Sequence, residues 1–206
     1  MSSIFLFLSL SVFLNAAVAA AHRSALQQGI AGEVLRFHVL ANSDSEADQN
    51  VKYKVRDAVL AWMSETVQSA EWEIPQETEK ERAVTIAFLA ENLSQVETVA
   101  NAVLEEENMP YRATAEITQC YFPDRTYGDC TFPAGWYEAL RICLGEARGQ
   151  NWWCLLYPGL CFSDCLHAVI EGDGLIRLEE TLTVEEYESL LKSPGQWEIG
   201  FRWFCF

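Results

Sequence analysis

A short apolar run that leads directly into an amphipathic helix, between residues 35 and 60, constrains the fold more than any other stretch. The run is rich in β-branched and aromatic side chains and has the length of a buried strand: Val34, Leu35, Phe37, Val39 and Leu40. Ser43 and Glu46 then form an S-x-x-E capping box, which predicts a helix start. Apolar residues recur every three or four positions from Val51 to Met63, so this helix needs a core to cover.

The first residues of the chain resemble an export signal. Residues 4–21 are apolar apart from Ser9, Ser11 and Asn15, and Ala-x-Ala patterns allow cleavage after Ala19 or Ala21. An uncleaved membrane anchor is the alternative. We therefore expect a signal peptide or anchor at 1–21, a connector at 22–32 and a single α+β domain at 33–206. Membrane contact is expected only through the N-terminal segment.

The charge of the chain excludes some classes of partner. The formal net charge is −16, and half of the residues are apolar, which is enough for a substantial core. An acidic surface repels phosphate groups, so we expect no nucleic-acid partner.

The remaining patterns predict an α+β fold with an antiparallel sheet of about four to five strands packed with three to four helices. Capping boxes at Thr78–Glu81, Ser94–Glu97 and Thr183–Glu186 predict three further helix starts. Residues 111–121, 137–145 and 151–157 predict a three-stranded antiparallel sheet, in which 146–150 is a hairpin turn and 122–128 a loop. Alternation at 197–205 predicts one more strand.

The turn after the first strand carries residues of catalytic type, namely His38, Ser43 and Asp44. Capping explains Ser43 and Asp44, and His38 lies on the strand face opposite Phe37. The G-x-S-x-G elbow is absent from the sequence. These residues therefore do not predict a catalytic site.

Seven cysteines, all in the second half of the chain, leave several interpretations open. Cys154, Cys161, Cys165 and His167 are possible zinc ligands, but paired C-x2-C knuckles are missing. A disulfide between Cys154 and Cys161 and free packed thiols are the alternatives. We expect no metal, no cofactor and no small-molecule substrate.

Trp152 and Trp153 follow each other in a predicted strand, so they point to opposite faces of the sheet. One of them is expected in the core and the other exposed or covered by a neighbouring element. An exposed tryptophan would make a good protein contact, because aromatic anchors dominate interface energies.

Two blocks of sequence resemble the stage II sporulation protein R family: RFHVLANSDSEADQNVKYKVRDAVL (36–60) and CYFPDRTYGDCTFPAGWYEALRICLGEARGQNWWCLLYPGLCF (120–162). Of the cysteines, only Cys154 and Cys161 match the family pattern. Pro158-Gly159 stands where a Pro-Pro pair is expected, which affects the shape of that loop.

The resemblance implies an intercellular signal of endospore formation. Such a protein is secreted from the forespore into the space between forespore and mother-cell membranes. There it activates a membrane-embedded aspartic protease that processes the sigma-E precursor. We expect a non-enzyme that binds this protease and shifts it towards an active dimer.

The expected contacts with the protease are His38, Asn42, Asp44 and the outward one of Trp152 and Trp153. Two alternatives stay open: an exported envelope hydrolase with a Cys/His site, and a structural septal protein.

Overall fold

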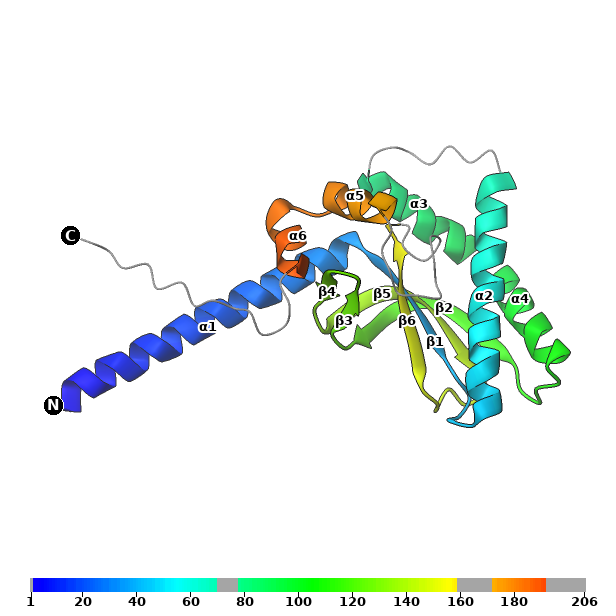
Figure 1. Ribbon diagram of the computed structural model, residues 1–206, viewed down its shortest axis with the longest axis horizontal. Helices are drawn as coiled ribbons and strands as arrows, with labels where there is room; N and C mark the ends of the chain where they lie inside the picture. The colour runs from blue at the N-terminus through cyan, green and yellow to red at the C-terminus, as the bar shows by residue number, and fades with distance from the viewer. Residues whose placement is uncertain (1, 70–77, 159–171, 192–206) are drawn as a thin grey trace.

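The computed structural model describes residues 2–69, 78–158 and 172–191, which form an α+β fold (Figure 1). The helices are α1 Ser2–Glu33, α2 Glu46–Ser69, α3 Thr78–Glu91, α4 Leu93–Glu106, α5 Gly172–Thr181 and α6 Val184–Leu191. The strands are β1 Leu35–Leu40, β2 Ala113–Phe122, β3 Arg125–Tyr127, β4 Cys130–Phe132, β5 Gly135–Leu144 and β6 Asn151–Tyr157. The predicted strand at 197–205, Cys161, Cys165 and His167 lie outside the described residues.

The main sheet is mixed, so the prediction of a purely antiparallel sheet is wrong. Its strand order is β2-β5-β1-β6, with β1 parallel to β5 and antiparallel to β6. A parallel pair needs a long crossover, and the segment from α2 to β4 supplies it between β1 and β5.

The predicted hairpin between β5 and β6 is also wrong, because β1 lies between these two strands. Residues 145–150 cross the end of β1 instead of forming a tight turn. The amide N–H of Gly149 donates to the carbonyl oxygen of Ala41 at 2.9 Å, and the N–H of Arg148 donates to that of Asn42 at 3.1 Å. The connection is thus tied to the strand that it passes.

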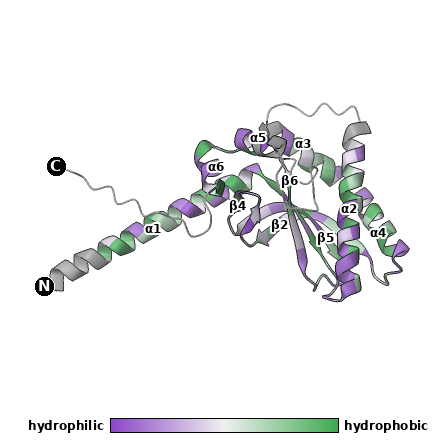
Figure 2. Cartoon of the chain, in the orientation of Figure 1, coloured by the Kyte–Doolittle hydropathy of each residue, from purple (hydrophilic) through white to green (hydrophobic). Residues whose placement is uncertain are grey.

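Each face of the main sheet carries its own core. Helices α2, α3 and α4 cover the first face through apolar residues that include Val55, Val59, Leu89, Ala100 and Leu104. The second face is covered by the C-terminal end of α1, the β3–β4 hairpin, α5 and α6, through residues that include Ile30, Val34, Phe132, Leu178 and Leu190. Figure 2 shows apolar and polar residues following one another along α2 and α4. The β3–β4 hairpin occupies part of the segment that we predicted as a loop.

Helix α1 changes character along its length. The side chains from Leu10 to Ala25 are exposed, including Phe13 at 74% and Val18 at 62%, whereas Ile30 is fully buried. Figure 1 shows the N-terminal part of α1 extending away from the rest of the chain. Among the described residues, no helix combines the length and the apolar character needed to cross a membrane.

The predicted capping boxes have different outcomes. In α6 the box is complete, since the N–H of Thr183 donates to the Glu186 carboxylate at 2.9 Å and the N–H of Glu186 donates to the Thr183 hydroxyl at 3.3 Å. The Ser94 box is wrong, because the N-cap of α4 is Asn92, two residues earlier. Glu97 instead accepts the N–H of Ala115 in β2 at 2.8 Å.

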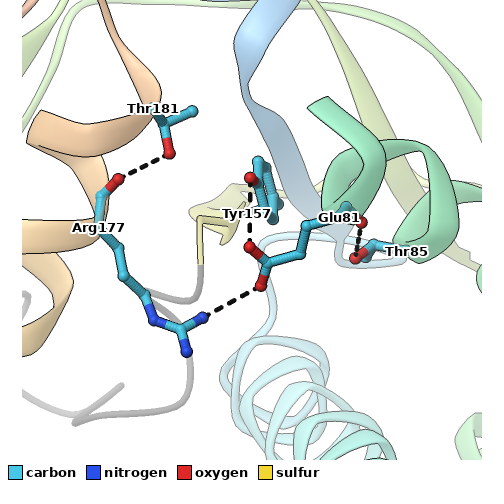
Figure 3. Close-up of polar contacts among 5 residues, drawn as sticks. All are labelled: Glu81, Thr85, Tyr157, Arg177 and Thr181. Carbon is cyan, nitrogen blue, oxygen red and sulfur yellow. Dashed lines mark hydrogen bonds and ion pairs between the residues drawn. The ribbon is translucent and has the colours of Figure 1, made fainter. Parts of the chain in front are cut away.

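Glu81 connects three elements at the top of the sheet (Figure 3). Its carboxylate accepts a hydrogen bond from the Tyr157 hydroxyl of β6 at 3.5 Å and pairs with Arg177 of α5 at 3.2 Å. This contact holds α5 against α3 and the end of β6.

Candidate functional site

A stacked pair of His38 and Trp153 lies on the second face of the sheet, between β1 and β6. The two residues are directly opposite in the antiparallel register, and their ring centroids are 5.7 Å apart with an interplanar angle of 21°. Nε2 of His38 lies 2.9 Å from the side-chain oxygen of Asn151. His38 is 7% exposed, while Trp153 and Asn151 are half-buried.

Arginine side chains surround this pair. The guanidinium of Arg125, from β3, lies 4.0 Å above the Trp153 ring. Arg141, from β5, is the neighbour of His38 on the other side and pairs with Glu116 of β2. In a chain of net charge −16, this is a local concentration of positive charge.

Arg36, two residues before His38, is fully buried without a carboxylate partner among the described residues. Its guanidinium packs on the rings of Phe122, Tyr127, Phe132 and Tyr137, at 4.4 to 5.6 Å from their centroids. It donates to the carbonyl oxygen of Cys154 at 3.1 Å and to the Tyr127 hydroxyl at 3.0 Å. The faces of these aromatic rings thus surround the guanidinium of Arg36 in the place that an anion usually takes.

Burial controls the ionisation of this site. It lowers the pKa of His38 to about 4, and the nearby Arg141 and Arg36 act in the same direction, against the hydrogen bond with Asn151. His38 is therefore neutral at pH 7. Burial also lowers the pKa of Arg36.

Four buried nitrogen atoms on this face have no hydrogen-bond partner among the described residues: Arg36 Nη1, His38 Nδ1, Arg125 Nε and Trp153 Nε1. Unsatisfied buried polar atoms are rare in folded proteins. The arginine and tryptophan atoms are donors that have no acceptor in this part of the structure. The arrangement is suited to binding rather than to proton transfer, because the imidazole of His38 is enclosed and weakly basic.

The described thiols do not form a Cys/His pair. Burial raises the pKa of Cys120, Cys130 and Cys143, so these side chains are protonated at neutral pH. Within the described ranges, no group of three or more possible metal ligands comes together.

The other expected contact residues lie apart from His38 and Trp153. Asn42 and Asp44 are at the end of β1, where they bind the N–H groups of Glu146 at 2.9 Å and Gln150 at 2.7 Å. Trp152 lies on the first face, where its ring meets Phe37 edge to face at 5.6 Å. The tryptophans thus point to opposite faces, as alternation predicts, and the structure brings together only His38 and Trp153 from the expected set.

The turn that holds Asn42 and Asp44 is built around Asp48, which the sequence did not single out. The carboxylate of Asp48 accepts hydrogen bonds from Asn42, Ser43 and Tyr111. Burial alone would raise its pKa, but these donors lower the pKa to about 2. Helix α2 begins at Glu46, and the Ser45 hydroxyl accepts the N–H of Asp48 at 3.2 Å. The capping box predicted at Ser43 is therefore displaced by two residues.

Arg125 and Asn151 are functional candidates that the sequence did not indicate. Arg125 lies in a segment that we predicted as a loop, and Asn151 gains its role only because β6 pairs with β1. Cys154 is disulfide-bonded, and the Cys154–Cys161 pair stays a prediction.

Comparison with known proteins identifies the family. Residues 31–167 match the family model of stage II sporulation protein R. A curated relative, stage II sporulation protein R of Bacillus subtilis (strain 168), is 35% identical over 135 residues, which is 66% of this chain and 56% of that protein. No solved structure matches the chain. The matched region contains the whole main sheet together with His38 and Trp153, and the chain belongs to the stage II sporulation protein R family.

Proposed function

We propose that this protein is a secreted signal of endospore formation that activates a membrane-embedded aspartic protease, and that this protease processes the sigma-E precursor in the mother cell. Membership of the stage II sporulation protein R family carries the proposal. The relative that matches is named as a sporulation protein, and the chain spans 56% of its length.

The form of helix α1 supports export. From Leu10 to Ala25 its side chains are exposed, among them Phe13 and Val18, whereas Ile30 is fully buried. Cleavage after Ala19 or Ala21 would therefore remove none of the buried residues that the structure describes. The domain that remains would be released into the space between forespore and mother-cell membranes.

The proposed action is binding without chemistry of its own. The described thiols are held in the protonated form, and His38 is buried and neutral. These residues therefore provide neither a thiolate nucleophile nor a basic imidazole that would activate one. The activator shifts the protease towards an active dimer because it has a higher affinity for that state. Its contact surface is the half-buried rim of the site, formed by Trp153, Arg125 and Asn151.

The test is to co-express this chain, the membrane protease and the sigma-E precursor in a host that does not sporulate. Precursor cleavage is followed with the intact chain and with a variant that lacks residues 2–21. Cleavage is expected only with the intact chain. Equal cleavage with both would contradict export, and no cleavage with an exported, folded chain would contradict activation.

A further inference from the structure

We propose that the second half of strand β2, residues 117–121, accepts an extended segment of a partner protein as an added strand. Strand β2 is at the edge of the main sheet, whose order is β2-β5-β1-β6. This inference concerns a different surface from the His38–Trp153 site, and it does not depend on the proposed function.

The register of β2 shows which backbone groups face outwards. The N–H of Gly145 donates to the carbonyl oxygen of Arg112 at 2.9 Å, and Ala113 is opposite Leu144 in the ladder. In an antiparallel pair, hydrogen-bonded and non-hydrogen-bonded positions alternate. Even-numbered residues of β2 therefore bond to β5, and the N–H and C=O groups of odd-numbered residues point away from the sheet.

Helix α4 covers the first half of this edge. Asn101 accepts the N–H of Ala113 at 2.9 Å and donates to its carbonyl oxygen at 3.2 Å, while Glu97 accepts the N–H of Ala115 at 2.8 Å. These side chains occupy the positions that a neighbouring strand would use, so the first half of the edge is closed.

The second half of the edge is open. Across residues 2–69, 78–158 and 172–191, no group is hydrogen-bonded to the outward N–H groups of Ile117, Gln119 and Tyr121. A row of unpaired backbone groups is a template for strand addition. Proteins that recognise extended segments use such an edge, with main-chain hydrogen bonds for affinity.

Two exposed aromatic residues lie at the same end. Tyr121 is 56% exposed and Trp136 is 62% exposed, and their rings meet edge to face at 5.8 Å across the β2–β5 pair. Aromatic side chains of this kind are common anchors in protein interfaces. They would contact apolar side chains on one face of the added strand.

The net charge of the chain favours a basic partner segment at this edge. The chain carries a net charge of −16, so a second copy of it is repelled, whereas a segment with Lys or Arg is attracted. The partner segment is therefore extended, apolar at alternate positions and basic at its ends.

The test uses two synthetic peptides of eight residues that alternate Val and Thr, one with Lys and one with Glu at both ends. Amide NMR signals of the full-length chain are followed during titration. The Lys peptide is expected to shift the amides of Ile117, Gln119 and Tyr121, and to bind at least tenfold more tightly than the Glu peptide. No shift at about 1 mM Lys peptide, or shifts confined to other surfaces, would overturn the proposal.

Gln119→Pro is the decisive variant, because it removes an outward N–H and no hydrogen bond to β5. It is expected to weaken binding of the Lys peptide at least tenfold, whereas Gln119→Thr, which keeps the N–H and adds no charge, is the matched control. Tyr121→Ala combined with Trp136→Ala keeps every backbone group and serves if the proline variant does not fold; it is expected to weaken binding at least threefold. Unchanged binding in the variant that folds, or a dimer of the chain that Gln119→Pro abolishes, would overturn the assignment to a partner protein.

Discussion

The His38 imidazole stacks on the Trp153 indole with ring centroids 5.7 Å apart. The same imidazole contacts Asn151, which lies 113 residues further along the chain, so His38 joins two distant strands. The pair has Arg125 above it and Arg141 beside it, and His38 is held neutral by burial. A buried base of this kind makes stability depend on pH in a predictable direction.

We predict that the free energy of unfolding falls as the pH is lowered from about 6.5 to about 4. The pKa of His38 is about 4 in the folded protein and near 6.5 when unfolded, so the unfolded chain binds the extra proton in this range. The loss is on the order of 3 kcal/mol, since one pKa unit corresponds to about 1.4 kcal/mol. Chemical denaturation at several pH values measures it. His38→Gln should remove this contribution, whereas His22→Gln should keep it; equal slopes in all three proteins would contradict the assignment.

Asp48→Ala should destabilise the protein by about 3 kcal/mol at pH 7. The change leaves Asn42, Ser43 and Tyr111 without their shared acceptor. Urea denaturation measures the effect, and Asp44→Ala is the control, because Asp44 is exposed and, among the described residues, accepts one backbone N–H, that of Gln150. The Asp48 contribution should disappear as the pH falls from about 4 to about 2, since its folded pKa is lowered to about 2. A cost below about 1 kcal/mol would show that this turn does not need the carboxylate.

Thr183→Ala should cost about 1 kcal/mol, because the Thr183 hydroxyl caps α6 through the N–H of Glu186. Ser94→Ala is the matched control and should change stability by less than about 0.5 kcal/mol, since Ser94 lies inside α4 and is not its N-cap. Thermal unfolding followed by circular dichroism compares the two. Equal losses would mean that the position of the cap in the structure is incorrect.

Removal of residues 1–21 should leave the stability of the domain unchanged within about 0.5 kcal/mol, because the side chains from Leu10 to Ala25 are exposed. Removal of residues 1–30 should instead cost several kcal/mol. It deletes the fully buried Ile30 and the hydrogen bond from Gln27 to the carbonyl oxygen of Trp136. Denaturant midpoints of both truncated chains test the difference, and a large loss from the shorter truncation would contradict the proposed boundary.

Local sequence patterns predicted the helices and strands well, but they did not predict which strands pair with one another. The run Leu35–Leu40 forms the predicted strand, and α6 starts at Val184, directly after Thr183, as its capping box predicts. The insertion of β1 between β5 and β6 could not be predicted, because a strand that is buried on both faces has the same apolar pattern whichever strands lie beside it. A turn of the length of 146–150 suits a hairpin equally well.

The same limit applied to the candidate site. Strand alternation placed His38 and Trp153 on single faces but did not bring them together. The burial of two charged side chains was also not predicted. Lys52 and Arg56 are only 1% and 5% exposed, although Lys and Arg on a helix usually mark a face exposed to solvent. Their long side chains lie along the Tyr53 ring, and Arg56 also covers Trp152. Such contacts depend on tertiary structure that residue types alone do not specify.

We propose that the chain activates the membrane protease by binding to it. The most direct measurement is the rate of sigma-E precursor cleavage by membranes that contain the protease, titrated with the purified chain and followed again after the chain is washed away. If activation occurs by binding, the cleavage rate should saturate at a fixed ratio of chain to protease and return to its basal value after washing. Full and lasting activation by a trace amount of the chain would contradict it, because that behaviour belongs to an enzyme.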